Sequence, residues 1–195
     1  MTGRLMAADK GERPGQSHTH VVFHFTDGSR LLFADSRQFG RIRLIEPEEP
    51  WAASLGPEPL VPSFTPDRFI GMLCGRRTPV KAFLLDQRRI AGIGNIYACE
   101  ALWEARIRPE KAAGTLSKPA IRRLHRALVN VLERAIELRG SSIDDYVDAR
   151  GRKGGAQNAL CVYGKDGRPC PRCGNAIVRT VLSQRGTWWC RKCQK

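Results

Sequence analysis

The sequence predicts an α+β protein in three parts, and three patterns support this fold class. Residues 1–45 contain short runs in which apolar and polar side chains alternate, as they do in half-buried β-strands. Residues 66–150 carry apolar side chains at three- and four-residue steps, the spacing of amphipathic helices. Residues 151–195 hold four closely spaced cysteines. We therefore expect part of a β-sandwich, a linker at residues 46–65, a helical domain and a small metal-stabilised hairpin.

The N-terminal part is expected to form an antiparallel sheet. The run 20–25 alternates, Asp27-Gly28 is a tight-turn sequence, and the apolar run 30–34 follows, which together predict a β-hairpin. Residues 41–45 alternate again and predict another strand. Three short strands make a poor independent core, and residues 1–6 also resemble strand material. We therefore expect further strands to precede this sequence.

Proline positions separate the sheet from the helices. Six of the twelve prolines lie in the range 46–66, a density that neither a helix interior nor a central strand tolerates. Thr65-Pro66 and Thr78-Pro79 are helix start signals, with a capping threonine and a proline at the first turn. Two short helices should begin there. Further helices are expected over residues 95–105 and from Ser117 onward.

The charge of the chain favours a polyanionic partner. Lysine and arginine number 33 against 19 acidic residues, which gives a net charge of +14 and a pI of about 10.1. Residues 151–195 hold ten of these cations and a single acid, Asp166. No apolar run approaches the roughly 18 residues that a membrane-spanning helix needs. We expect a soluble cytosolic protein that binds nucleic acid rather than membrane.

Four cysteines near the end of the chain have the spacing of a zinc site. Cys170 and Cys173 form one Cys-x-x-Cys pair, Cys190 and Cys193 form another, and sixteen residues separate the pairs. Two such pairs complete the tetrahedral shell of a structural Zn²⁺ ion and leave no position for water. The alternative is a redox-active dithiol pair. Because the cytosol keeps thiols reduced, we expect one structural zinc.

The residues between the two cysteine pairs predict a β-hairpin. The runs 177–182 and 187–189 are β-prone, and they flank Ser183-Gln-Arg-Gly186, which puts Arg185 at the tip. A guanidinium group there can hold a phosphate with two parallel hydrogen bonds. The alternative is an exposed arginine that contacts no ligand.

A glycine-rich turn lies between two of the expected helices. In Gly92-Ile-Gly-Asn95, the absence of side chains on Gly92 and Gly94 lets a ligand approach the backbone, and the next helix begins with free N–H groups. Such a turn suits a phosphate, to which Asn95 would add a side-chain donor. The alternative is a turn that needs glycine only for helix packing.

These motifs resemble those of one family. The run 84–87 (Leu-Leu-Asp-Gln) leading into residues 90–98 (Ile-Ala-Gly-Ile-Gly-Asn-Ile-Tyr-Ala) resembles the helix-two-turn-helix signature of the formamidopyrimidine-DNA glycosylase family. Residues 162–195 resemble that family's C-terminal zinc finger. Residues 1–5 and 35–40 are similar to two segments of its N-terminal domain. The resemblance covers nearly the whole chain.

The resemblance implies an activity and a partner. Members of the family excise oxidised purines such as 8-oxoguanine and formamidopyrimidines, and then cut the strand by β,δ-elimination as apurinic-site lyases. The implied partner is double-stranded DNA that contains an oxidised base or an abasic site. The resemblance also implies a monomer that is bacterial, cytoplasmic and associated with the nucleoid.

The resemblance also implies residue roles. Asn95 and Arg185 would grip the phosphates beside the lesion. Met1, Arg37 and Phe39 would fill the gap that the extruded base leaves, which offsets the few kcal/mol lost in unstacking it. The alternative for Phe39 is a core aromatic side chain.

Residues 146–159 correspond to the family's loop that closes over the flipped base. The family often has an aromatic residue near Gly154-Gly155, and this sequence has none there. The pair Arg37 and Phe39 nonetheless favours the oxidised-purine branch over the oxidised-pyrimidine branch known as endonuclease VIII.

The family's catalytic pair has no counterpart at the start of this sequence. The nucleophile in the family is the amine of an N-terminal proline, followed by a glutamate general acid, whereas this sequence begins Met1-Thr2. An α-amine has a pKa of about 7.7–8.0 and is therefore partly neutral at physiological pH. The resemblance, however, places Met1 beside the duplex and not in the lesion pocket. We therefore expect this polypeptide to bind zinc and DNA with little or no base excision.

Three accounts of the chain remain open from the sequence. It is an N-terminally truncated or mis-started form of a DNA-formamidopyrimidine glycosylase, a non-catalytic binder of damaged DNA, or a zinc nucleic-acid module of another class. An upstream reading frame encoding Met-Pro-Glu would support the first account. Preference for abasic-site duplexes would support the second, and binding of RNA as well would support the third.

Overall fold

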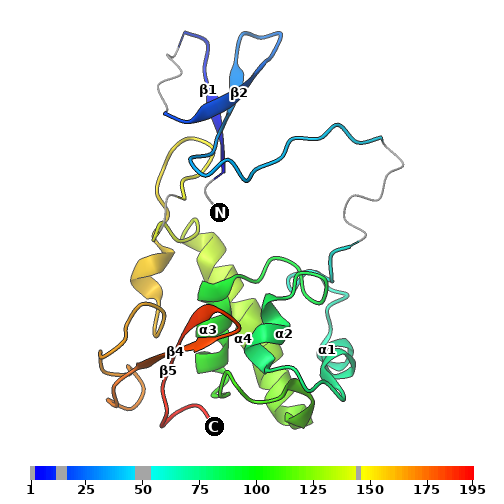
Figure 1. Cartoon of the computed structure of the whole chain (residues 1–195), viewed down its shortest axis with the longest axis vertical. Helices are drawn as coiled ribbons and strands as arrows, with labels where there is room; N and C mark the ends of the chain where they lie inside the picture. Colours follow the sequence, from blue (N-terminus) through cyan, green and yellow to red (C-terminus); the bar gives the residue numbers. More distant parts are fainter. Residues whose placement is uncertain (1–2, 12–16, 47–53, 144–145) are drawn as a thin grey trace. The chain divides into compact units, whose positions relative to one another are not determined.

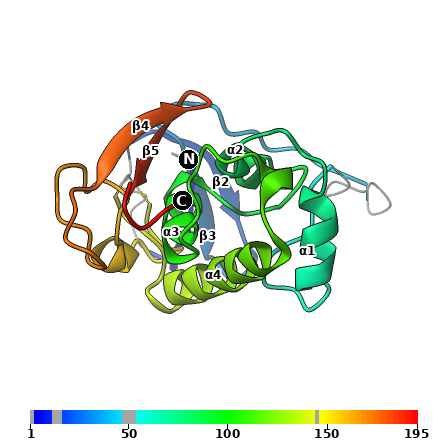
Figure 2. The same ribbon diagram turned by 90° about the horizontal axis from the view of Figure 1, so that it is seen from below.

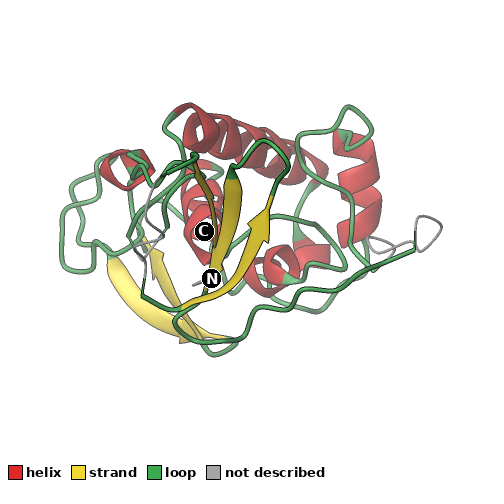
Figure 3. Cartoon of the chain, turned by 90° about the horizontal axis from the view of Figure 1, so that it is seen from above, coloured by secondary structure: helices red, strands yellow, loops and turns green. Residues whose placement is uncertain are grey.

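The computed structural model describes residues 3–11, 17–46, 54–143 and 146–195 (Figure 1). The chain divides into two units. The sheet unit consists of Met1–Glu49 and Arg134–Ala159, and the helical unit consists of Pro50–Glu133 and Leu160–Lys195. The predicted α+β class is confirmed, because helices and two separate antiparallel sheets are both present (Figure 3).

The sheet unit contains three antiparallel strands in the order β1-β3-β2. They are β1 (Arg4–Ala8), β2 (Thr19–His24) and β3 (Arg30–Ala34). The predicted hairpin is confirmed, since β2 pairs with β3 and the connecting turn closes around Gly28 at a φ of 86°. This left-handed conformation suits glycine, which has no Cβ to clash with the backbone.

The strand predicted at residues 41–45 is wrong. These residues have no regular secondary structure, and Leu44 is 93% exposed. Alternation predicts a strand only where a neighbouring strand can accept and donate the backbone hydrogen bonds. Among the described residues no strand pairs with this segment.

The helical unit is built around α3 (Asn95–Glu104). The other helices are α1 (Pro66–Leu73), α2 (Val80–Leu85) and α4 (Lys118–Glu137), the last of which continues into the sheet unit. A short 3₁₀ turn, η1 (Ala113–Thr115), precedes α4, and a second, η2 (Ala156–Ala159), lies in the sheet unit. Figure 2 shows α3 between the C-terminal hairpin and α2, and α3 contacts both.

A side-chain cap explains where α1 begins, and apolar spacing explains how α4 packs. The Oγ1 of Thr65 accepts the Arg68 N–H at 3.2 Å, which confirms the predicted start of α1. In α4 the predicted apolar face is buried against the other helices, and Leu124 and Leu128 are at most 1% exposed. No described helix combines the length and the apolar composition that a membrane crossing would need.

The C-terminal hairpin pairs β4 (Val178–Leu182) with β5 (Arg185–Trp189). Ser183 and Gln184 form the two-residue turn, and both have positive φ, at 49° and 58°. This backbone matches the right-handed twist of the flanking strands. Arg185 is the first residue of β5, so the prediction that it lies at the tip is confirmed.

Candidate zinc site and nucleic-acid interface

The four predicted ligands converge at the base of the hairpin. The Sγ atoms of Cys170, Cys173, Cys190 and Cys193 all lie within 4.8 Å of one another. The pair Cys170–Cys193 is separated by 3.9 Å and the pair Cys173–Cys190 by 3.5 Å. A tetrahedron with zinc–sulfur bonds near 2.3 Å has sulfur–sulfur edges of about 3.8 Å. The donor set therefore fits one structural zinc ion, as predicted.

Gln194 ties the second cysteine pair to the segment that follows α3. Its side chain is 1% exposed; Oε1 accepts the Cys190 N–H at 2.8 Å and Nε2 donates to the Ile107 carbonyl at 2.9 Å. One side chain thus orders the metal turn and connects it to Ile107, within the same unit. No local pattern in the sequence predicts this role, because a glutamine beside a cysteine carries no signal of its distant partner.

A buried carboxylate anchors the segment that leads into the zinc module. Glu100, in the middle of α3, is 3% exposed. Its Oε1 accepts the N–H groups of Val162 and Tyr163 at 2.9 and 2.8 Å, and its Oε2 accepts that of Cys161 at 2.7 Å. Bonds of backbone N–H groups to a charged acceptor are stronger than bonds to a neutral one.

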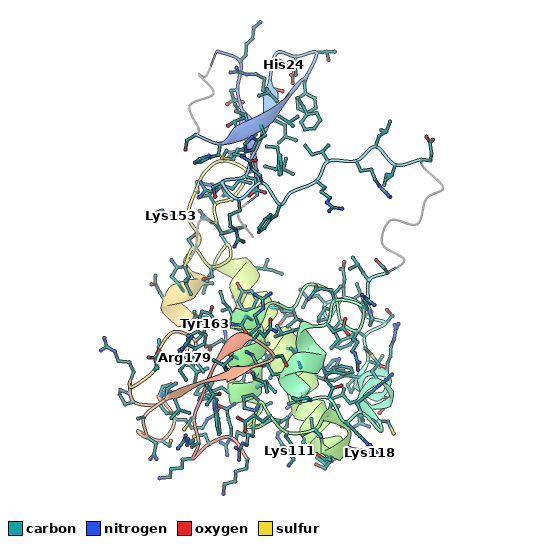
Figure 4. The ribbon with its side chains drawn as sticks, in the orientation of Figure 1. His24, Lys111, Lys118, Lys153, Tyr163 and Arg179 are labelled. Atoms are coloured by element: carbon teal, nitrogen blue, oxygen red, sulfur yellow. The ribbon has the colours of Figure 1, made fainter. Side chains whose placement is uncertain are left out.

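An aromatic contact also joins this segment to the hairpin. The Tyr163 ring, labelled in Figure 4, packs on Trp188 of β5 at a centroid distance of 4.4 Å.

A buried lysine on α2 contacts the tip of the hairpin. Lys81 is fully buried, and its Nζ donates to the Gly186 carbonyl at 2.9 Å and to the Thr187 hydroxyl at 2.8 Å. Burial lowers the pKa of the Lys81 ammonium; Cys99 opposes this shift and Arg185 adds to it. Burial also raises the pKa of the Cys99 thiol. A single lysine within the apolar run of residues 80–85 was the signal that could have identified Lys81.

Asn95 begins α3 and reaches the same carbonyl. Its Nδ2 donates to the Gly186 oxygen at 3.0 Å, while its buried Oδ1 accepts no hydrogen bond within the described parts of the chain. Nδ2 carries a second hydrogen besides the one donated to Gly186. Asn95 therefore lies against the residue that follows Arg185.

The glycine turn before α3 leaves its backbone open. Gly92 has a φ of 79°, and a Cβ placed on Gly92 or on Gly94 would meet no atom within 4 Å. Gln87 fixes the turn, because its Oε1 accepts the Gly92 N–H at 2.8 Å and its Nε2 donates to the Ile93 carbonyl at 2.9 Å. The bond from Asn95 to Gly186 thus brings the start of α3, with Gly92 and Gly94 just before it, next to the hairpin tip that carries Arg185.

The sheet unit holds Arg37 and Phe39 on one loop. Asp35, which is 2% exposed, accepts the N–H groups of Arg37 and Gly40 at 3.3 and 2.8 Å. The Arg37 guanidinium carbon lies 5.5 Å from the centroid of the Phe39 ring. Phe39 is 75% exposed, so it is not a core side chain. Met1 lies outside the described residues.

The loop 146–159 also belongs to the sheet unit. The Asp148 carboxylate accepts the backbone N–H groups of Arg150 and Arg152, each at 2.9 Å. The bond from the Arg152 N–H, reinforced by the Arg152 side chain, lowers the pKa of Asp148. The Ala149 carbonyl accepts the Ala7 N–H from β1 at 2.8 Å. The loop is therefore fixed at its turn and against the sheet.

Comparison with known families identifies the class of this protein and then its family. The family model of the formamidopyrimidine-DNA glycosylase N-terminal domain matches residues 1–42, and that of the formamidopyrimidine-DNA glycosylase H2TH domain matches residues 55–147. The model of the zinc finger found in FPG and IleRS matches residues 167–195. The helical unit with its four-cysteine hairpin therefore places the chain among the zinc-containing helix-two-turn-helix proteins.

Similarity over the whole chain is specific to one family within that class. The chain is 44% identical over 199 residues to the formamidopyrimidine-DNA glycosylase of Desulforamulus reducens, and the match covers 100% of this chain and 72% of that protein. It is 45% identical over 198 residues to the enzyme of that name from Symbiobacterium thermophilum, covering 100% of this chain and 65% of that protein. The chain belongs to the formamidopyrimidine-DNA glycosylase family. This membership rules out a zinc module of another class.

Solved structures of the family share the fold. The complex between the Lactococcus lactis Fpg and DNA containing an abasic site matches with a TM-score of 0.90 at 38% identity, covering 100% of this chain and 72% of that one. A MutM complex with DNA containing carbocyclic 8-oxo-G matches with the same TM-score, identity and coverage. Both neighbours are bound to damaged DNA.

Proposed function

We propose that this chain binds double-stranded DNA at an oxidised base or an abasic site and acts in base excision repair. One observation supports this proposal above the others: Lys81 and Asn95 hold the Gly186 carbonyl and so set Arg185 next to the start of α3. A fixed arginine beside the N-terminus of a helix is an arrangement suited to an anion.

The proposed contacts hold the DNA backbone and do not read its sequence. The second Nδ2 hydrogen of Asn95 and the Arg185 guanidinium would bind phosphates next to the damaged nucleotide. The open backbone at Gly92 and Gly94 would let the strand approach. Because these groups recognise phosphate alone, the preference for damage has other sources, one of which is the ease with which a damaged nucleotide leaves the stack.

The proposed role of the sheet unit is to fill the space left by that nucleotide. Phe39 is 75% exposed and Arg37 lies over its ring, so an apolar surface and a charge are both available. Met1 is proposed for the same role from the family resemblance. In this account the exposure of Phe39 has a function, since phenylalanine is one of the apolar side chains that insert between base steps of a duplex.

Removal of zinc tests the proposed DNA binding. Without the metal the two cysteine pairs at the base of the hairpin are no longer held together, so Arg185 should no longer be held beside Asn95. We expect affinity for an abasic-site duplex to fall by at least about 10-fold when a chelator strips the zinc, and to recover when zinc is added back. The undamaged duplex of the same sequence is the control. Unchanged affinity of the metal-free protein for the abasic-site duplex would overturn the proposal.

Catalysis by this chain is a separate proposal. By family, the reaction is removal of an oxidised purine followed by cleavage of the strand at the abasic site. Borohydride trapping on a duplex containing 8-oxoguanine tests whether the polypeptide 1–195 carries out this reaction. A covalent adduct forms only if an amine of the chain attacks the damaged nucleotide. A place in the bacterial cytoplasm, at the nucleoid, follows from the proposed partner.

A further inference from the structure

The last turn of α3 contacts a zinc ligand through an indole group. Trp103 Nε1 donates to the Sγ of Cys170 at 3.4 Å. The ring also packs against the apolar cluster around the metal site, which includes Cys99, Val162 and Ile177. Trp103, partly buried beside the apolar cluster at the metal site, thus reaches a metal-binding sulfur with a polar hydrogen.

Arg172 fixes the orientation of this indole. It lies between the two cysteines of the first pair, with its guanidinium carbon 4.1 Å from the centroid of the Trp103 ring. Its Nη1 donates to the Trp103 carbonyl at 2.9 Å and its Nη2 to the Glu104 carbonyl at 3.4 Å. The cation therefore covers the face of the ring and also satisfies carbonyl groups at the C-terminus of the helix. This leaves the N–H edge of the ring directed at Cys170.

A hydrogen bond to a metal-bound thiolate changes its chemistry in a predictable way. Zinc-bound sulfur keeps much of its negative charge, so an N–H donor stabilises it in the metal-bound form. Partners of metal ligands commonly contribute about 10–100-fold to metal affinity. The ring alone, without its N–H, would supply packing but not this effect.

We propose that Trp103 is a positioning residue of the zinc site. Its indole N–H orients Cys170 and slows the loss of zinc, and Arg172 holds the indole in place. This role concerns retention of the metal and goes beyond the proposed contacts with DNA. It connects the end of α3 to the zinc, while Asn95 at the start of the same helix contacts the hairpin tip.

The Trp103→Phe variant tests this proposal because it removes the N–H and keeps an aromatic ring for Arg172. We expect the variant to transfer zinc to a colorimetric chelator about 10-fold faster than the unmodified protein. In the cobalt-substituted protein, the thiolate-to-cobalt charge-transfer band should move to lower energy, because the sulfur loses its stabilising donor. A merely structural role would not shift this band.

The matched control is Trp188→Phe. The indole of Trp188 donates to Asp166 Oδ1 at 2.8 Å and not to a sulfur, so its removal should leave the cobalt band unshifted. An unshifted band and an unchanged rate of zinc transfer in Trp103→Phe would overturn the proposal. Should Trp103→Phe fail to fold by circular dichroism, Arg172→Lys takes its place. A smaller band shift of the same sign is then expected, and no shift overturns the proposal.

Discussion

Lys81 and Asn95 donate to the same acceptor, the carbonyl oxygen of Gly186, at 2.9 and 3.0 Å. The two donors come from different helices, α2 and α3, whereas the acceptor lies at the tip of the zinc hairpin. A carbonyl oxygen has two lone pairs, so both bonds can form together. The position of Arg185 relative to the start of α3 therefore depends on two side chains that are far from it in sequence.

Replacement of Lys81 by methionine should weaken DNA binding while leaving the stability of the fold nearly unchanged. The variant loses the bonds to Gly186 and Thr187, so we expect affinity for an abasic-site duplex to fall about 10-fold, or about 1.4 kcal/mol. The free energy of unfolding should change little, since relief from burying an ammonium offsets the lost bonds. Titration with a fluorescent duplex and urea unfolding measure the two quantities. Lys118→Met, at an exposed lysine labelled in Figure 4, should change neither.

Replacement of Glu100 by glutamine should destabilise the helical unit. The amide offers one oxygen and one NH₂ group to three N–H donors, so at least one donor is left unsatisfied in a buried site. We expect a loss of about 2–4 kcal/mol in the free energy of unfolding, measured by urea. Glu110→Gln is the control, because it removes only the exposed pair with Arg108 and should cost no more than about 1 kcal/mol. Equal stability of the two variants would refute this account of Glu100.

Replacement of Gly154 by alanine should disturb the loop 146–159. A Cβ at Gly154 would lie 2.1 Å from the Gly140 carbonyl oxygen, so the loop would have to move. At Gly155 the nearest atom would be the Leu138 oxygen at 3.8 Å, an ordinary contact. We expect faster limited proteolysis within the loop for Gly154→Ala, with the cleavage sites assigned by mass spectrometry. The prediction fails if Gly155→Ala, the matched control, is cut as fast.

Replacement of Arg185 by alanine should reduce the salt dependence of DNA binding. Each phosphate neutralised by a cation contributes roughly −0.9 to the slope of log K against log salt concentration. Loss of the proposed contact should make the slope less negative by about 1 and weaken binding evenly across sequences. Affinities measured between low and moderate salt test this. Arg191→Ala, at an exposed arginine at the base of the hairpin, should leave the slope closer to that of the unmodified protein.

The strand predicted at residues 41–45 illustrates the limit of local patterns. The alternation in that segment is as clear as in residues 20–25, yet only the latter pair with another strand in the described part of the chain. The alternation of apolar and polar residues indicates which face of a strand would be buried. It does not indicate whether a neighbouring strand is present to complete the backbone hydrogen bonds.

The sequence by itself determined the features whose causes are local. The Thr65-Pro66 helix start, the Asp27-Gly28 turn and the zinc ligands in Cys-x-x-Cys pairs all depend on residues a few positions apart. The tertiary structure alone decided what Lys81, Glu100 and Trp103 do. Their partners lie 105, 61 and 67 positions away along the chain in the bonds to Gly186, Cys161 and Cys170. A buried polar side chain needs a hydrogen-bond partner. The packing of the helices selects that partner, and no rule of sequence spacing predicts it.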